Sequence, residues 1–230
     1  MLGEMDIIPA VKVTRSERGV AHKPYITASH TQSEFRALRQ KIRLLLSESA
    51  TIAVCATAPG EGASWTAAML ACATAEEDDP VVLVDGDIRN PTQASEFELT
   101  NDRVLLPPST IETGFAFHST SSKQILVLSP SGMPGYTERE AGDSLRSVIP
   151  VLRTQWRNVI IDCPPIPSSG LLLDIAPVVE GVILVVKAER ERRDEIKQKI
   201  DWLKRMSPPL LGVIFNKGKA HLPGLLERAL

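Results

Sequence analysis

The sequence predicts an α/β protein built on a single doubly wound, mostly parallel β-sheet with helices on both faces. Two patterns support this fold class. Short runs of apolar residues, each as long as one strand, alternate with longer segments in which apolar residues recur at helical spacing. The runs are apolar throughout, which indicates strands covered on both faces, as in parallel sheets.

The composition is that of an ordinary globular protein. Of 230 residues, 43% are hydrophobic, and 26 basic residues nearly balance 28 acidic ones. We therefore expect no nucleic-acid partner. We also expect no direct membrane insertion, because the apolar runs fall far short of the roughly 20 residues of a membrane span. Three cysteines lie far apart in apolar stretches, which favours buried, reduced thiols in a cytoplasmic protein: Cys55, Cys72 and Cys163. Any association with the inner membrane would have to come through a partner.

The domain is expected to begin after a poorly patterned segment. Residues 1–30 mix Pro, Gly, Ser, His and charges without periodicity, and we interpret them as an N-terminal arm of low intrinsic order. Residues 31–230 would form one α/β domain. Its first element is an amphipathic helix from Ser33 to about Ser47. The apolar residues that define this helix recur three or four positions apart: Phe35, Leu38, Ile42 and Leu45.

Strands and helices then alternate. The strand at 51–56 (TIAVCA) leads through a Gly/Pro turn into a small-residue helix at 64–75, which Asp78-Asp79-Pro80 ends. The Ser/Thr-rich stretch at 90–124 indicates loops with short helices. The other elements follow from apolar runs and helical spacing: strands at 81–84, 125–128, 158–161, 181–186 and 210–215, and helices at 138–155 and 193–206.

Three strand ends carry residues with chemistry. The turn 57–64 contains Gly60 and Gly62 and precedes a helix, an arrangement that can cradle phosphate. The second strand ends in Asp85-Gly86-Asp87, and the strand at 158–161 ends in Asp162. Each has a plainer alternative, as a simple turn or a capping carboxylate. Ligands of such sheets bind beyond the carboxyl ends of the strands, so the three together predict one phosphoryl-transfer site with Mg²⁺.

These segments resemble motifs of the bacterial tyrosine kinases of polysaccharide export, in the P-loop group that contains MinD and ParA. PGEGAS is similar to the Walker A stretch PGEGKS, VVLVDGDIRNP to the second motif, and NVIIDCPP to Walker B. SEFRALR is similar to the oligomerisation helix and LLGVIFNK to the closing strand. The resemblance, from about Ser33 to Lys217, implies a P-loop NTPase fold that binds ATP or ADP with Mg²⁺.

The resemblance also assigns roles residue by residue. The nucleotide would contact the loop and the closing strand: Pro59, Gly60, Glu61, Gly62, Ala63, Ser64, Trp65 and Asn216. Ser64, Asp85 and Asp162 would hold the metal, and the catalytic carboxylates would be Asp85, Asp87 and Asp162. Arg36 and Arg39 match the oligomer interface, although they could equally be solvated helix charges. Trp65 is either a packing residue or a ring beside the nucleotide.

The departures from the motif concern the positive charge. Ala63 stands where the phosphate-binding lysine is expected, and Ala58 stands at the signature-lysine position of MinD and ParA. A hydrogen bond to a charged group contributes roughly 1.5–3 kcal/mol, so nucleotide binding should be weak or lost. Loss of one charge-stabilising donor costs about 10²–10³ in rate. Within the motif after the second strand, Arg89 is the residue that could supply the missing positive charge.

The chain also has only two tyrosines, Tyr25 and Tyr136, and neither lies in the terminal cluster expected of a self-phosphorylating kinase.

The leading hypothesis is a degenerate tyrosine-kinase-like P-loop protein that acts as a regulatory or scaffold subunit in exopolysaccharide or capsule biosynthesis. Its partner would be a membrane chain-length (co-polymerase) protein, an active kinase of the family or a second copy of itself. One alternative is an active kinase or ATPase that uses a non-standard cation, so the sequence leaves open whether the chain is an enzyme. Another is a MinD/ParA-like positioning ATPase, which the missing signature lysine disfavours.

Overall fold

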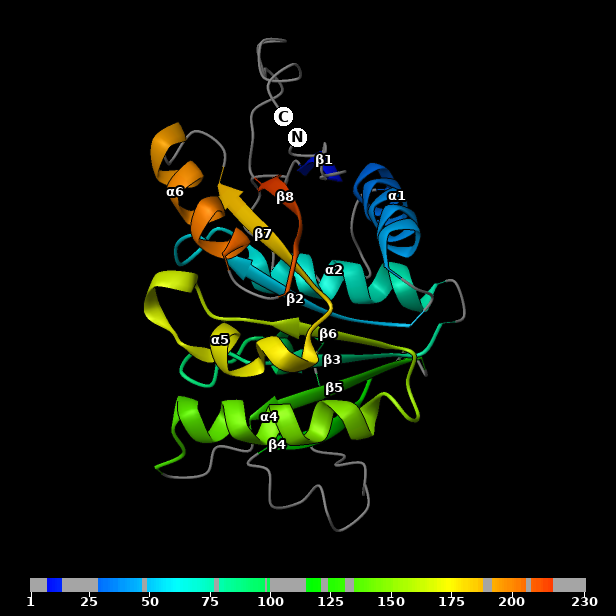
Figure 1. Ribbon diagram of the computed structural model, residues 1–230. Helices are drawn as coiled ribbons and strands as arrows, with labels where there is room; N and C mark the ends of the chain where they lie inside the picture. The colour runs from blue at the N-terminus through cyan, green and yellow to red at the C-terminus, as the bar shows by residue number, and fades with distance from the viewer. Residues whose placement is uncertain are drawn as a thin grey trace.

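The computed structural model describes residues 8–13, 29–46, 49–76, 79–97, 99, 115–120, 124–130, 135–187, 192–205 and 208–216. Its centre is one eight-stranded sheet in the order β1-β8-β7-β2-β6-β3-β5-β4 (Figure 1). The strands are β1 (Ile8–Val13), β2 (Ala50–Ala56), β3 (Val81–Asp85), β4 (Phe115–Ser119), β5 (Ile125–Pro130), β6 (Asn158–Asp162), β7 (Gly181–Lys187) and β8 (Leu210–Asn216). All neighbouring strands pair in parallel except β4 and β5, which confirms the predicted fold class.

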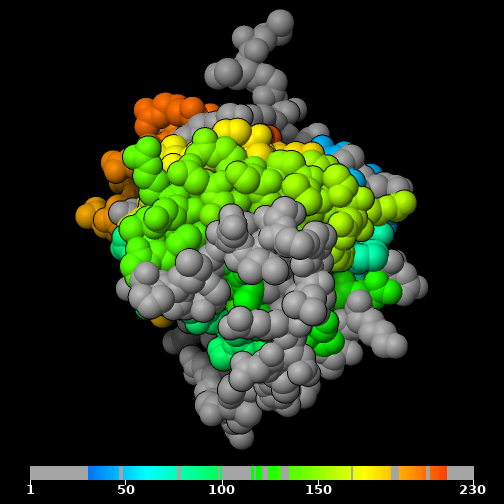
Figure 2. Space-filling view, turned by 90° about the horizontal axis from the view of Figure 1, so that it is seen from below, coloured from blue at the N-terminus to red at the C-terminus, as the bar shows by residue number. Residues whose placement is uncertain are grey.

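Helices cover both faces of this sheet. They are α1 (Ser29–Leu45), α2 (Ala63–Ala75), α3 (Gln93–Glu96), α4 (Glu138–Leu152), α5 (Leu171–Ile175) and α6 (Arg193–Lys204). Successive side chains of a strand point to opposite faces, and β2 shows the result: Ile52 packs with α1 and α2, whereas Ala53 packs with α4, α5 and α6. Figure 2 shows α4 as a continuous outer band on one side of the molecule. The sheet therefore separates two hydrophobic cores.

The predicted core residues take their expected places. Phe35, Leu38 and Ile42 of α1 are each at most 1% exposed. The three cysteines are buried and free, as expected, and burial raises the pKa of both Cys55 and Cys72 to about 12, which makes these thiols unreactive at neutral pH. No helix in the described ranges combines the length and the apolar character needed to cross a bilayer.

Two strands are absent from the sequence prediction. Ile8–Val13, placed in an arm of low order, forms β1 and pairs in parallel with β8. Phe115–Ser119, placed among loops, forms β4, antiparallel to β5. Both lie at sheet edges, where pairing with the neighbouring backbone supplies the hydrogen bonds that a short segment cannot supply alone. The rest of the 1–30 arm up to residue 28, and residues 217–230, lie outside the described residues.

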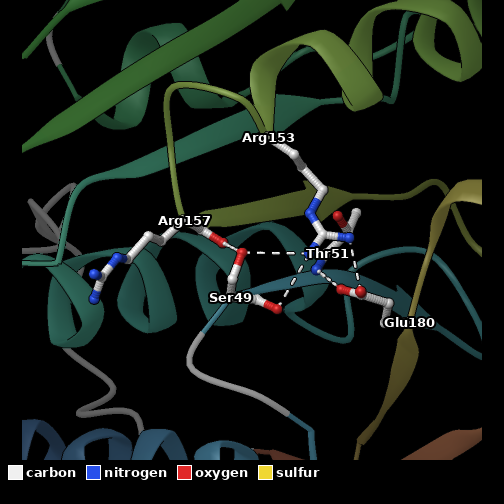
Figure 3. A network of polar contacts seen from close by, with 5 residues as sticks. All are labelled: Ser49, Thr51, Arg153, Arg157 and Glu180. Atoms are coloured by element: carbon white, nitrogen blue, oxygen red, sulfur yellow. Dashed lines mark hydrogen bonds and ion pairs between the residues drawn. The ribbon is translucent and has the colours of Figure 1, made fainter.

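A network of polar side chains lies at the edge of the sheet where the strands begin (Figure 3). We call it the amino-edge network: Ser49, Thr51, Arg153, Arg157 and Glu180. The Glu180 carboxylate accepts the backbone N–H of Thr51 and the guanidinium of Arg153, both at 2.7 Å. Arg153 also donates to the carbonyl oxygen of Ser49 at 3.2 Å, and the Ser49 hydroxyl donates to the carbonyl of Arg157 at 2.8 Å. The network ties the start of β2 to the residues that follow α4 and precede β7.

Candidate nucleotide-binding site

The turn from β2 into α2 forms a braced loop, residues 57–64, which we call the phosphate loop. Gly60 and Gly62 have φ angles of 77° and 99°, a left-handed conformation that glycine adopts without strain. The fully buried Glu61 carboxylate accepts the N–H groups of Thr57 at 3.0 Å and Ala58 at 3.1 Å. Because this internal brace fixes the curl of the backbone, the loop is shaped before any ligand binds.

Asn216 at the end of β8 supports the same loop from a distant part of the sequence. Its side-chain amide donates to the carbonyl of Glu61 at 2.7 Å and is buried. A Cβ atom at Gly62 would lie 2.1 Å from the Asn216 nitrogen, so this close approach requires glycine. The predicted nucleotide contact at Asn216 remains a prediction, whereas its contact with the loop is observed.

Two buried carboxylates lie beside the loop. Asp85 ends β3 and Asp162 ends β6, and the two are direct partners in the register of these strands. One oxygen of Asp85 accepts the N–H groups of Thr92 and Gln93 at 2.8 and 2.9 Å. One oxygen of Asp162 accepts the side-chain amide of Gln93 at 2.8 Å, and the neighbouring Ser64 hydroxyl acts as a further donor to this carboxylate.

Burial dominates the electrostatics of this pair. It raises the pKa of Asp85 to about 6, against the lowering effect of its backbone hydrogen bonds. It raises the pKa of Asp162 to about 8, and the neighbouring Asp85 charge adds to that rise. The pair consequently favours a proton or a cation over two bare charges.

The oxygen atoms of this site that have no hydrogen-bond partner are suitable ligands for a magnesium ion. One carboxylate oxygen each of Asp85 and Asp162, and the amide oxygen of Gln93, are buried without a hydrogen-bond partner. Among the described residues no group of three His, Cys, Asp or Glu side chains gathers, so an all-protein cage is absent from that part of the chain. Mg²⁺ prefers oxygen ligands and uses one or two carboxylates together with substrate phosphates. Ser64, Asp85 and Asp162 could hold it in this way.

Asp87 and Arg89 make contacts outside the Asp85–Asp162 pair. Asp87 accepts the N–H groups of Arg89 and Asn90 at 3.2 and 3.0 Å, which is the turn-capping role given above as the plainer alternative. The Arg89 guanidinium lies 3.1 Å from the Glu138 carboxylate in the first turn of α4. The replacement cation that the motif suggested is thus paired with another acid.

The remaining predicted residues lie away from the loop opening. Trp65 is 6% exposed and packs edge-to-face on Phe35 with ring centroids 5.5 Å apart, which supports its packing role. Arg36 pairs with Glu76 at 2.6 Å, and Arg39, 3% exposed, pairs with Asp79 at 3.0 Å. These acids lie at and beyond the end of α2, so both arginines anchor α1 within the chain. Their role in an oligomer interface remains a prediction.

Two site residues were missed by the sequence analysis. Gln93 bridges Asp162 and the carbonyl oxygen of Ser64, at 2.8 and 3.0 Å. Its place two residues after the Asp85-to-Pro91 motif was a usable signal. Lys199 of α6 donates to the carbonyl of Thr57 at 3.2 Å. No local motif marks it, because the two residues are 142 positions apart.

Comparisons with known proteins show which proteins this chain is similar to. No protein-family model matches the chain. Tyrosine-protein kinase CpsD of Streptococcus agalactiae is 28% identical over 198 residues, covering 83% of this chain and 85% of the relative. Tyrosine-protein kinase YwqD of Bacillus subtilis is 27% identical over 198 residues, covering 83% of each chain.

Solved structures give the same picture. The chimerical protein CapA2B2 superposes with a TM-score of 0.76 and 27% identity, over 91% of this chain and 94% of that one. The kinase domain of the Escherichia coli tyrosine kinase ETK gives 0.75 at 16% identity, over 93% of both chains. MinD of Pyrococcus horikoshii, solved with Mg-ADP, gives 0.60 at 20% identity, over 78% of this chain and 76% of that one. These last two show the fold alone. The homologues of this chain are bacterial tyrosine-protein kinases, and its fold is that of their kinase domains and of MinD-like P-loop NTPases.

Proposed function

We propose that the chain is a degenerate relative of the bacterial tyrosine kinases, with weak or absent phosphotransfer. It serves as a regulatory or scaffold subunit in exopolysaccharide or capsule biosynthesis. Its partner is a membrane chain-length (co-polymerase) protein or an active kinase of the same group, and this partner brings it to the membrane. The likeness to CpsD and YwqD supports the choice of kinase system.

Ala63 is the observation that carries the proposal. It begins α2 at the mouth of the phosphate loop and is 8% exposed. Its methyl group supplies neither charge nor hydrogen bond where a lysine would follow the charge that develops on the transferred phosphoryl group. The braced backbone and the Ser64, Asp85 and Asp162 set support nucleotide binding without that lysine. The site therefore keeps the groups that favour nucleotide binding and lacks the positive charge that favours phosphotransfer.

A direct test measures phosphotransfer with labelled ATP and Mg²⁺, by the full chain alone and with a tyrosine-containing substrate. We expect ATP hydrolysis and phosphotyrosine at background. Ala63→Lys should restore the missing donor and tighten ATP binding by about tenfold or more. Ala63→Met is the matched control, because it adds similar length without charge. Robust hydrolysis or tyrosine phosphorylation by the unmodified chain would reject the proposal.

The second candidate is an active kinase or ATPase with a cation from outside the loop. The intact arrangement of Ser64, Asp85 and Asp162 favours it. The same experiment separates the two candidates. An enzyme adapted to another cation should gain nothing from Ala63→Lys or lose activity, whereas a degenerate site should gain affinity.

A further inference from the structure

A lysine from outside the phosphate loop reaches that loop. Lys199 Nζ donates to the carbonyl oxygen of Thr57 at 3.2 Å, at the point where the loop leaves β2. The side chain is half-buried. It therefore brings an ammonium group to a loop whose own two lysine positions hold Ala58 and Ala63.

The fold fixes this position through the hydrophobic core. Ile196 and Ile200, which flank Lys199 on α6, pack against the core on the α4 side of the sheet, and Leu203 is buried there. The helix follows β7 and connects it to the parallel β8, so it runs back from the carboxyl ends of the strands. Side chains of a helix tilt toward its N-terminus, and Lys199 accordingly points toward the edge that carries the loop.

The electrostatics of this edge call for a cation. The buried carboxylates Glu61, Asp85 and Asp162 all lie here. A nucleotide adds the negative charge of its phosphates, which a single Mg²⁺ only partly balances. Arg89, the other basic residue suggested for this role, is paired with Glu138.

We propose that Lys199 is a phosphate-binding residue that supplies part of the positive charge missing from the phosphate loop. An ammonium group has three N–H donors, so it can hold the Thr57 carbonyl and a phosphate oxygen together. The inference rests on the nucleotide site proposed above and extends it, since it names the residue that supplies the positive charge. It requires nucleotide binding but no phosphotransfer.

The test is calorimetric titration of ATP, ADP and adenosine, each with Mg²⁺, into the folded full chain. Lys199→Met should weaken ATP binding by about 10-fold or more and leave adenosine binding within about twofold. Lys199→Arg should recover most of the loss. Lys197→Met is the matched control, because this lysine is exposed on the same helix and should have no effect. In an Ala63→Lys background, Lys199→Met should cost less, because the new lysine takes over its role.

The outcomes separate this inference from the proposed function. Equal losses for ATP and adenosine would show that Lys199 only shapes the loop, and unchanged ATP affinity would show that it has no role; either overturns the inference. A chain that binds no nucleotide overturns it as well. None of these results bears on the non-catalytic role, which the phosphotransfer assay decides by itself.

Discussion

The two edges of the sheet differ in the partners of their acidic side chains. At the edge where the strands begin, acids meet guanidinium groups: Arg153 with Glu180 at 2.7 Å, and Arg39 with Asp79 at 3.0 Å. At the edge where the strands end, the described contacts of Asp85 and Asp162 are to N–H groups, the Gln93 amide and the Ser64 hydroxyl. At the first edge each of these acids is paired with a guanidinium group of the chain, whereas at the second edge one oxygen each of Asp85 and Asp162 is buried without a hydrogen-bond partner.

This difference separates structure from function within one fold. Buried acceptors without partners destabilise a protein, and they persist where a ligand supplies the missing interaction. The edge where the strands end is thus suited to bind Mg²⁺ together with the phosphates of a nucleotide. Substitutions at the two edges should consequently differ in their sensitivity to pH, Mg²⁺ and nucleotide.

The largest expected effect is on pH-dependent stability. The pKa values of Asp85 and Asp162 are raised to about 6 and about 8 from an ordinary 3.8. The folded state therefore binds protons more tightly than the unfolded state, and stability is lost as pH rises through these values. Thermal unfolding without Mg²⁺ should show a melting temperature that falls between pH 5 and 9, by the equivalent of several kcal/mol.

Asp162→Asn should remove the part of that fall that continues from about pH 6 to about pH 8, and added Mg²⁺ should flatten it by stabilising the ionised carboxylates. Asp143→Asn, an exposed acid on α4, is the control and should leave the pH profile unchanged. A melting temperature that stays level or rises over this range in the unmodified chain would contradict the assignment of a strained carboxylate pair.

An intermediate effect is expected at Gly62. A Cβ there would overlap the Asn216 amide and force a non-glycine residue into a left-handed conformation. Gly62→Ala should lower the free energy of unfolding by about 2–4 kcal/mol and abolish nucleotide binding. Gly60→Ala is the comparison, because it has a similar φ but open space around its Cβ, and should cost about 1 kcal/mol. Denaturant titration that finds equal costs would rule out the Asn216 contact as the constraint.

The smallest effect is expected in the amino-edge network. Arg153→Ala removes the partner of Glu180 and the donor to the Ser49 carbonyl. Both side chains are about one-third exposed, so the cost should be about 1 kcal/mol in urea titration. Nucleotide affinity should not change. Arg146→Ala breaks an exposed pair on α4 and should cost about 0.3 kcal/mol. A change in nucleotide binding at Arg153 would show that the two edges are coupled.

Much of the site followed from local sequence. Apolar runs placed β2, β3 and β6, and motifs at their ends placed the phosphate loop, Asp85 and Asp162 on one edge, because parallel strands end at the same edge. Local sequence could not place Trp65, whose packing partner Phe35 lies on another helix. It also could not show that Arg89 pairs with Glu138 or that Arg39 is buried, because both depend on how helices pack.

The sequence by itself determined the fold class, the carboxylate half of the site and the absence of lysine from the phosphate loop. These are properties of residue type and short spacing. The tertiary structure alone decided that Gln93 bridges Asp162 and Ser64, that Asn216 braces Glu61, and that Lys199 reaches Thr57. Those contacts join residues 29 to 155 positions apart, and packing on two faces of a sheet sets their distances. No periodicity or motif records such a distance, because it is fixed only once the core has closed around both elements.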